Sequence, residues 1–453
     1  MEPLRRLFAM ESKNLLFCYD YQKSMFRRFS ILSLFSIGFL WTGHAKLHAN
    51  ELINSSTFTD TNQKSSLDSL SFLQERISAQ FITRYLQDSN IFLRENETEA
   101  DIINASVQLG IKGGGLPTDP GLSYRALYGG NYFSSLTDEF EYDSPADHNF
   151  LSGVELRGAF TKIRLNANLE EYGGYARSEP FDGGVSSSIG ESRNLGYKRK
   201  RLEIGVSREL STSVLDLGLS IDDYDYKFTE IFSGSSVDYD RERVAADLSW
   251  FFEPTFLAKT RLGLGVTTGQ EEVPQNFLGA QNFLAPSLRA KWNFSPKTAF
   301  AGWFGFDERW RGSDDFSETT SVYGLKGFWT APTDTQLSVD ITKQVYPSIF
   351  ERDDNVATKK FSIGARQDFN RGISLDLRFF YEFSDYQPTK SGFLRSRTED
   401  LKSFRVSLGK EMNINFFEDS QVSIFYNHLT NDSTKEYYDF ERDQFGLQFR
   451  FSL

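Results

Sequence analysis

Long hydrophobic runs are almost absent from this 453-residue sequence, and its mean hydropathy is -0.44. A helix that spans a bilayer needs about 20 predominantly apolar residues, and the only comparable stretch is residues 31–41 (ILSLFSIGFLW). Helical membrane proteins with several spans are therefore excluded. Disorder is disfavoured as well, because 43 Phe and 20 Tyr give more aromatic content than disordered chains carry.

Cysteine and histidine are also scarce. The single Cys18 precedes the candidate export signal described below, so we expect neither a disulfide framework nor a thiolate metal site. Beyond that signal only His148 and His428 remain, and neither has the spacing of a nucleophilic triad. We therefore expect no enzymatic activity, no cofactor and no metal. The net charge of -12 disfavours binding to nucleic acid, whose phosphates it would repel.

The N-terminal region resembles an export signal. Residues 25–30 (MFRRFS) are basic and precede the 11 apolar residues 31–41, which are too few to span a bilayer as a helix. We interpret residues 25–49 as a signal peptide cleaved after Ala45 or Ala49, and residues 1–24 as an upstream extension. An N-terminal anchor helix is the alternative. Residues 50–77, rich in Ser, Thr, Asn and Gln, would form a polar periplasmic lead-in or plug.

Apolar residues alternate with polar or small ones along the rest of the sequence. Residues 445–453 (FGLQFRFSL) and 373–384 (ISLDLRFFYEFS) are clear examples, and the pattern recurs at residues 163–169, 215–221, 262–266, 288–292 and 422–426. This period of two is typical of strands with one apolar and one polar face. The strands reach about 15 residues, whereas those of a soluble β-sandwich, the alternative fold, would have about 5 to 6.

Short turns and longer polar loops divide these strands in alternation. The predicted short turns lie at residues 115–120, 160–161, 210–212, 253–255, 295–297, 331–333, 370–372 and 416–419, and the longer loops include residues 178–194, 269–276, 348–355, 387–398 and 430–439. We predict an all-β, antiparallel, up-and-down transmembrane barrel of about 18 strands (16 to 18) over residues 78–453. The even number brings the C-terminus to the periplasmic side, with the short turns.

Aromatic residues gather at the strand ends, where a membrane interface favours amphipathic rings. One set flanks the short turns: Phe160, Trp250, Phe252, Trp292, Phe294, Trp329, Phe369 and Phe416. A second set lies near the long loops: Tyr172, Tyr175, Tyr224, Tyr226, Trp310, Tyr346, Tyr386 and Tyr438. We interpret the two sets as the two aromatic belts of a membrane protein.

Residues that alternate with the apolar positions would line the lumen. The basic ones are Arg157, Arg164, Lys259, Arg261, Arg289, Lys291, Arg366, Arg378, Arg405 and Arg450, and the acidic ones are Glu155, Glu203, Asp216, Asp247, Asp340, Asp376 and Glu382. Because Arg pairs bidentately with carboxylate and phosphate, a basic wall could guide anionic sugars or small anions. The alternative is that these charges pair with one another across strands.

Several segments resemble a family of outer-membrane β-barrel porins that often accompany exopolysaccharide synthesis genes in Gram-negative bacteria. These are residues 85–92 (YLQDSNIF), 99–102 (EADI), 122–126 (LSYRA), 147–149 (DHN) and 288–298 (LRAKWNFSPKT). Asp88, Ser89 and Asn90 form the sharpest match, and the family assigns them no catalytic role. The family ordinarily ends in Phe, whereas this chain ends in Leu453.

We therefore expect a passive, porin-like channel of the cell outer membrane, with a charged, Arg-containing lumen. The resemblance implies export of surface polysaccharide or uptake of small solutes, and the basic wall suggests that the solute is anionic. The alternative function is a structural or adhesive barrel with an occluded lumen, whose acidic loops bind a partner. Outer-membrane lipid and the barrel assembly machinery are the expected partners, and a monomer is favoured.

Overall fold

The computed structural model describes fifteen stretches of the chain. They are residues 77–90, 99–114, 120–136, 146–173, 196–226, 229–232, 235–238, 240–255, 257, 259–272, 280–311, 317–348, 355–387, 397–414 and 417–452. The predicted extension, signal peptide and polar lead-in lie outside the described residues, except for Ile77, which begins the first strand. Within the described residues, no helix has the length and apolar character needed to cross a membrane.

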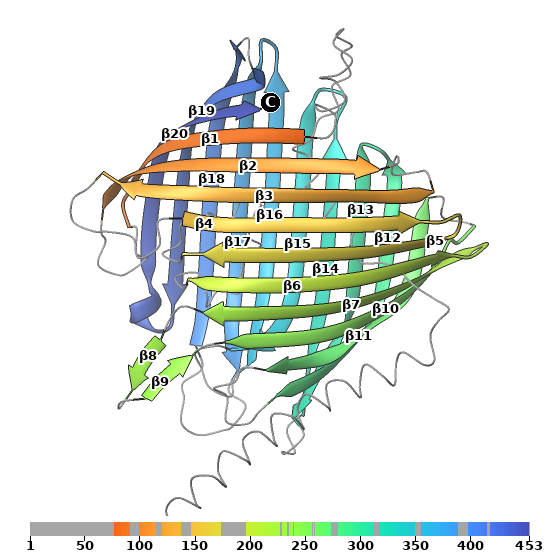
Figure 1. Ribbon diagram of the computed structural model, residues 1–453. Coiled ribbons are helices and arrows are strands. Elements are labelled where there is room, and N and C mark those ends of the chain that lie inside the picture. Colours follow the sequence, from red (N-terminus) through yellow and green to blue (C-terminus); the bar gives the residue numbers. More distant parts are fainter. Residues whose placement is uncertain are drawn as a thin grey trace, which may run out of the picture. The chain divides into compact units, whose positions relative to one another are not determined.

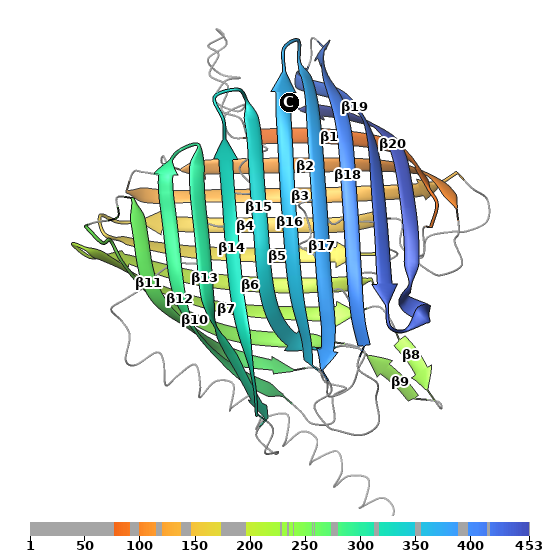
Figure 2. The same ribbon diagram turned by 180° about the vertical axis from the view of Figure 1, so that it is seen from behind.

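Long antiparallel strands make up almost all of the described chain (Figures 1 and 2). The first half contains β1 (Ile77–Asp88), β2 (Ala100–Gly114), β3 (Gly121–Ser135), β4 (Ala146–Arg157), β5 (Thr161–Tyr172), β6 (Tyr197–Glu209), β7 (Ser213–Tyr226), the short β8 (Thr229–Phe232) and β9 (Ser235–Asp238), and β10 (Arg241–Phe252). The second half contains β11 (Thr260–Glu272), β12 (Gln281–Ser295), β13 (Thr298–Arg311), β14 (Ser317–Thr330), β15 (Thr335–Pro347), β16 (Asn355–Phe369), β17 (Ile373–Gln387), β18 (Arg397–Ile414), β19 (Phe417–Ser433), the 3-10 turn η3 (Glu436–Tyr438) and β20 (Phe440–Ser452).

Eighteen of these strands form one closed sheet. Each pairs with the next along the chain, β7 pairs with β10 across the separate β8–β9 hairpin, and β20 pairs with β1. The strands of the near wall cross those of the far wall in Figure 1, as the strand tilt of a closed barrel requires. The predicted all-β, antiparallel barrel and its 18 strands are confirmed.

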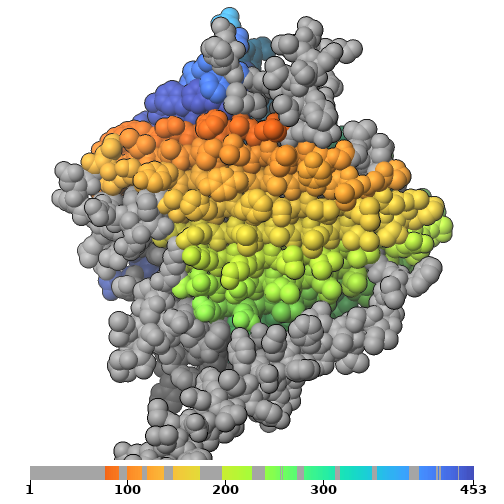
Figure 3. All heavy atoms as spheres, in the orientation of Figure 1, coloured from red at the N-terminus to blue at the C-terminus, as the bar shows by residue number. Residues whose placement is uncertain are grey.

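The alternation in the sequence separates two faces of the barrel. Apolar side chains on the predicted outer positions are exposed, among them Leu264 (55%), Leu288 (62%) and Phe445 (55%). The intervening positions along the strands point inward and include buried Asp247 and Ser249 and half-buried Arg289. Figure 3 shows the outside of strands β1 to β7 as a continuous surface of side chains. An apolar outside around a polar inside is the arrangement that a lipid environment selects.

Short connections join the strands at one end of the barrel, which we call the turn end. Ser295↔Thr298 closes the β12–β13 turn, where the Ser295 hydroxyl accepts a hydrogen bond from the Lys297 amide at 3.1 Å. In the β16–β17 turn Gly372 has a φ of 68°, a conformation that glycine adopts without strain. Ser452 pairs with Gln80 of β1, and its neighbour Phe451 packs on Phe417 at the start of β19, so the last strand ends at the turn end, as predicted.

The opposite end, which we call the loop end, corrects one prediction. Tyr172, Tyr226, Tyr346 and Tyr386 are buried instead of forming an outer belt, because their positions in the alternation point inward. Tyr175 lies outside the described residues. The outer face there carries Trp310 and three tyrosines whose hydroxyls donate to an aspartate of the next strand: Tyr85 to Asp101, Tyr381 to Asp400 and Tyr426 to Asp443. The belt at the turn end is exposed as predicted for Phe160, Trp250, Phe252, Trp292, Phe294, Trp329 and Phe369, whereas Phe416 lies outside the described residues.

Candidate functional site

The polar inner face of the barrel is the candidate site, and its middle is occupied by a dense group of charged side chains. Arg289 of β12 donates from Nη1 and Nη2 to the two carboxylate oxygens of Asp247 of β10, at 2.8 and 2.7 Å. Ser249 also accepts from Arg289, and the Thr267 hydroxyl donates to Asp247 at 2.6 Å. The sheet brings these residues together because inward positions on β10, β11 and β12 lie side by side.

Lys291 extends this group to a more distant strand. Its ammonium lies 3.7 Å from the buried carboxylate of Asp216 on β7 and 4.2 Å from the centre of the Phe251 ring. Strands β7 and β12 are separated by β10 and β11, so the ion pair reaches along the inner wall. The middle of the wall is therefore built of opposite charges held within contact distance.

A second group of paired charges lies on β4 and β5 near the turn end. Glu155 accepts from Arg157 at 2.9 Å and lies 2.7 Å from the ammonium of Lys162 and 3.3 Å from Nε of Arg164. Glu155 and Arg164 face each other directly in the ladder. Three basic side chains therefore share one carboxylate here, which leaves this part of the wall with a positive balance.

The other basic residues predicted to line the lumen occupy varied positions. Arg261, Arg366 and Arg378 pair with Glu253, Asp368 and Asp376 at 2.7, 3.0 and 2.8 Å. Lys259 is placed in the turn that precedes β11, where its ammonium donates to the Phe294 carbonyl at 2.6 Å, so it is not part of a strand. Arg405 stacks on the Phe425 ring at 4.7 Å, and Arg450 donates to Gln421.

Contacts between oppositely charged neighbours are thus the common feature of this set. At least seven of the ten basic residues form an ion pair: Arg157, Arg164, Arg261, Arg289, Lys291, Arg366 and Arg378. These contacts favour the alternative in which lumen charges neutralise one another.

A buried network that the sequence reading missed lies at the loop end. Glu271 of β11 accepts from Arg241 of β10 at 3.0 Å and from Arg309 of β13 at 2.6 Å. Arg309 also pairs with Asp307 at 3.0 Å and donates to the Val345 carbonyl of β15. All four charged side chains are buried.

This network spans strands that are not neighbours. The guanidinium carbon of Arg241 lies 5.4 Å from the centre of the Tyr346 ring, although β11 to β14 separate β10 from β15 in the wall. Side chains from these strands therefore meet in the interior. Inward aromatic and basic residues at this level therefore extend from the wall into the interior.

A similar group continues around the wall on β5 to β7. Arg199 donates to both carboxylate oxygens of Asp222 at 2.7 Å, lies 3.5 Å from Glu170, and stacks on the Tyr224 ring at 4.9 Å. The alternation could have revealed both loop-end groups, because each member is at an inward position. Glu271 in addition falls in residues 269–276, which were predicted as a loop, whereas β11 runs to Glu272.

The segment Asp88, Ser89 and Asn90 lies at the closing seam, the pairing of β1 with β20. Nε of Arg442 donates to the two carboxylate oxygens of Asp88 at 2.9 and 3.0 Å, and both side chains are buried. Ser89 exchanges two hydrogen bonds with the backbone of Asp443, at 3.0 and 2.8 Å, and the Asn90 amide donates to the Glu441 carbonyl at 3.0 Å. These contacts give the three residues a structural role in joining the first strand to the last.

No family model and no curated protein matches the chain. Among solved structures, it is similar to the outer membrane protein OpdK from Pseudomonas aeruginosa (12% identity, TM-score 0.42, 84% of this chain and 100% of that chain covered). OccAB4 of Acinetobacter baumannii has 12% identity, a TM-score of 0.42 and coverage of 83% and 98%. OccK2 (OpdF) of P. aeruginosa, solved in complex with glucuronate, has 12% identity, a TM-score of 0.43 and coverage of 84% and 99%.

The closed sheet and its two faces define the class of protein. All backbone groups of a lipid-exposed strand must be paired, and only closure of the sheet achieves this for a β structure. With its apolar outside, polar inside and short turns at one end, this chain is an outer-membrane β-barrel protein.

Proposed function

We propose that this barrel is a passive, porin-like channel for small polar or anionic solutes. The observation that supports the proposal is an 18-stranded closed wall whose inner face carries charged side chains from end to end. A barrel of this strand number encloses an aqueous lumen unless a segment of the chain fills it. Transport would be diffusion along this wall, with no turnover and no cofactor.

The inner wall suggests anions as the preferred class of solute. Arg157, Lys162 and Arg164 surround one carboxylate near the turn end. An anionic saccharide could exchange its own carboxylate for that of Glu155, because a guanidinium forms strong, charge-assisted hydrogen bonds with any carboxylate. The resemblance of the segments around Asp88 and Trp292 to porins of exopolysaccharide gene clusters makes a surface polysaccharide our specific candidate.

An adhesive or structural barrel with an occluded lumen is the second candidate. The contact between Arg241 and Tyr346 favours it, since side chains from β10 and β15 meet at the loop end. In that case the loops would bind a partner outside the cell, and the barrel would serve as an anchor.

Planar-bilayer conductance of refolded residues 50–453 separates the two candidates. An open channel gives discrete current steps, and anion preference appears as a shift of the reversal potential across a salt gradient. A folded barrel that passes no current would contradict the channel and support the occluded alternative.

Charge reversal then tests the role of the inner wall. Arg261→Glu and Arg366→Glu change inward charges at partly exposed positions and should move the reversal potential toward cation preference. Lys402→Glu is the matched control, because Lys402 has the parity of the exposed Phe404 on the outer face and pairs there with Asp432 at 2.7 Å. Equal shifts from inner and outer variants would show that the inner wall does not select the ions.

A further inference from the structure

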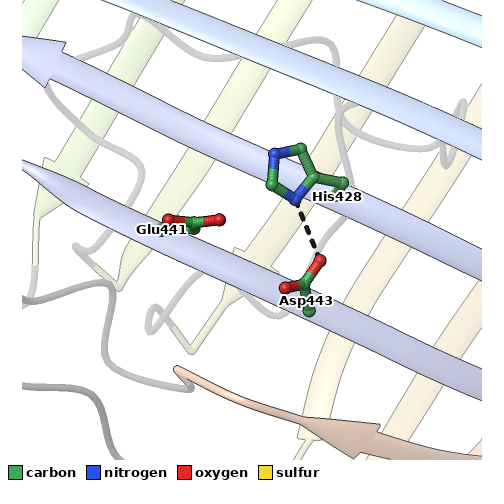
Figure 4. A group of neighbouring side chains, drawn as sticks. All are labelled: His428, Glu441 and Asp443. Atoms are coloured by element: carbon green, nitrogen blue, oxygen red, sulfur yellow. Dashed lines mark hydrogen bonds and ion pairs between the residues drawn. The ribbon is translucent and has the colours of Figure 1, made fainter.

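Three potential metal ligands meet on the outer face of the barrel near its loop end. His428 of β19 lies directly opposite Asp443 of β20, and Glu441 precedes Asp443 by two residues on the same face. One ligand atom from each lies within 4.8 Å of the others. Figure 4 shows the three side chains grouped over the two neighbouring strands.

The backbone beneath these residues is held on both sides. On one side β20 pairs with β19 from Asp419↔Ser452 to Asn431↔Phe440. On the other side, Ser89 hydrogen-bonds the backbone of Asp443, and Asn90 hydrogen-bonds the carbonyl of Glu441. Ligands on a rigid sheet keep their separation, which favours binding because the backbone loses little conformational entropy when the cation binds.

Neighbouring groups also orient the ligands. The Tyr426 hydroxyl donates to Oδ1 of Asp443 at 2.5 Å, and the same oxygen lies 2.9 Å from Nδ1 of His428. Metal-binding carboxylates are usually held by a hydrogen bond from a residue outside the ligand set, as Tyr426 provides here. The side chains of His428 and Asp443 are 34% and 47% exposed, so a cation can reach them from outside.

We propose that His428, Glu441 and Asp443 bind a divalent first-row transition cation such as Zn²⁺. Two carboxylates and one imidazole make a mixed oxygen and nitrogen ligand set, which suits Zn²⁺, Ni²⁺ and Cu²⁺, whereas Mg²⁺ and Ca²⁺ prefer oxygen alone. The cation also offsets the repulsion between two carboxylates on one face of a strand. Three protein ligands leave a coordination position for water.

The site would join the last two strands outside the lumen. Its ligands come from β19 and β20, and β20 carries the closing seam, so a bound cation would add a cross-link beside the contact of Asp88 with Arg442. The inference is independent of the channel proposal, because the site faces away from the inner wall.

Zn²⁺ binding to the full chain, extracted from the outer membrane without a polyhistidine tag, tests the proposal. Competition with a chromophoric chelator in excess Mg²⁺ should give one Zn²⁺ per chain. His428→Ala and Glu441→Gln should each weaken binding by more than about tenfold, and Tyr426→Phe by about tenfold. With Cu²⁺ as the probe, the nitrogen splitting in the paramagnetic resonance spectrum should disappear in His428→Ala.

His148→Ala is the matched control, because that imidazole contacts the Tyr128 hydroxyl at 2.9 Å on another part of the barrel. Heat-modifiable mobility on a gel verifies that each variant folds, and Glu441→Gln retains the size of the side chain. Equal Zn²⁺ affinity in His428→Ala and His148→Ala, or displacement of Zn²⁺ by Mg²⁺, would overturn the proposal.

Discussion

Removal of Arg289 should destabilise the barrel strongly. Arg289 and Asp247 have side chains that are 9% and 11% exposed, and two hydrogen bonds of 2.8 and 2.7 Å join them. Arg289→Met removes the guanidinium from the buried carboxylate of Asp247, to which the hydroxyls of Thr267 and Ser249 still donate. Breaking a buried ion pair in this way costs about 3 to 5 kcal/mol, and we expect the lower figure because the lumen is polar.

Urea unfolding of the folded barrel in lipid vesicles measures this cost as a shift of the midpoint at constant slope. Asp247→Asn combined with Arg289→Met removes both charges and should recover about 2 kcal/mol, which a double-mutant cycle reports as coupling. Arg261→Met is the control, since Arg261 and Glu253 are 40% and 58% exposed and such a pair contributes about 1 kcal/mol or less. If Arg289→Met and Arg261→Met lower the free energy of unfolding by the same amount, Asp247 is solvated as in bulk water, and the argument for a buried ion pair is wrong.

Three further predictions concern the seam, the loop end and the topology. Asp88→Asn should lower the temperature at which the folded barrel loses its compact gel mobility, because it leaves Arg442 buried beside a neutral group. Asp101→Asn on the outer face is the control and should have little effect. Tyr346→Ala should raise the single-channel conductance, because it removes an aromatic ring that meets Arg241 in the interior. The outer-face variant Tyr381→Ala is the control. Equal conductance of the two variants would show that Tyr346 does not limit the current. Protease added to intact cells should cut the connections β5–β6 and β17–β18 and spare residues 295–297 in the β12–β13 turn, and cutting at that turn would reverse the orientation.

The fold could be predicted from the sequence because the alternation directly records which face meets lipid. Apolar residues at every second position of 373–383 become the outer face of β17, with Ile373 and Phe379 exposed. The positions of the turns could also be predicted, since Pro296 and Gly372 suit the backbone of a turn better than the middle of a strand. The number of strands follows once the turns and loops are located.

The choice of partner across the lumen could not be predicted. Alternation assigns Arg241, Glu271 and Arg309 to the interior, but only the register and curvature of the sheet decide that all three meet. The tyrosines at the loop end show the same limit. Tyr346 has an aromatic ring near a strand end whichever way it points, and the assumption of an interface belt placed it on the wrong face.

The pairing of β1 with β20 at the closing seam has the largest loop-closure entropy cost among the pairings of the described strands. Tyr381 and Asp400 meet across a hairpin after 19 residues, whereas Asp88 and Arg442 are 354 positions apart. Loop-closure entropy grows with the logarithm of loop length, so the seam costs roughly 2.5 kcal/mol more than a hairpin contact. Among pairings of the described strands, β1 with β20 is the only one that needs the whole chain to be delivered. The bonds from residues 88–90 to β20 can therefore form only after β20 has been synthesised.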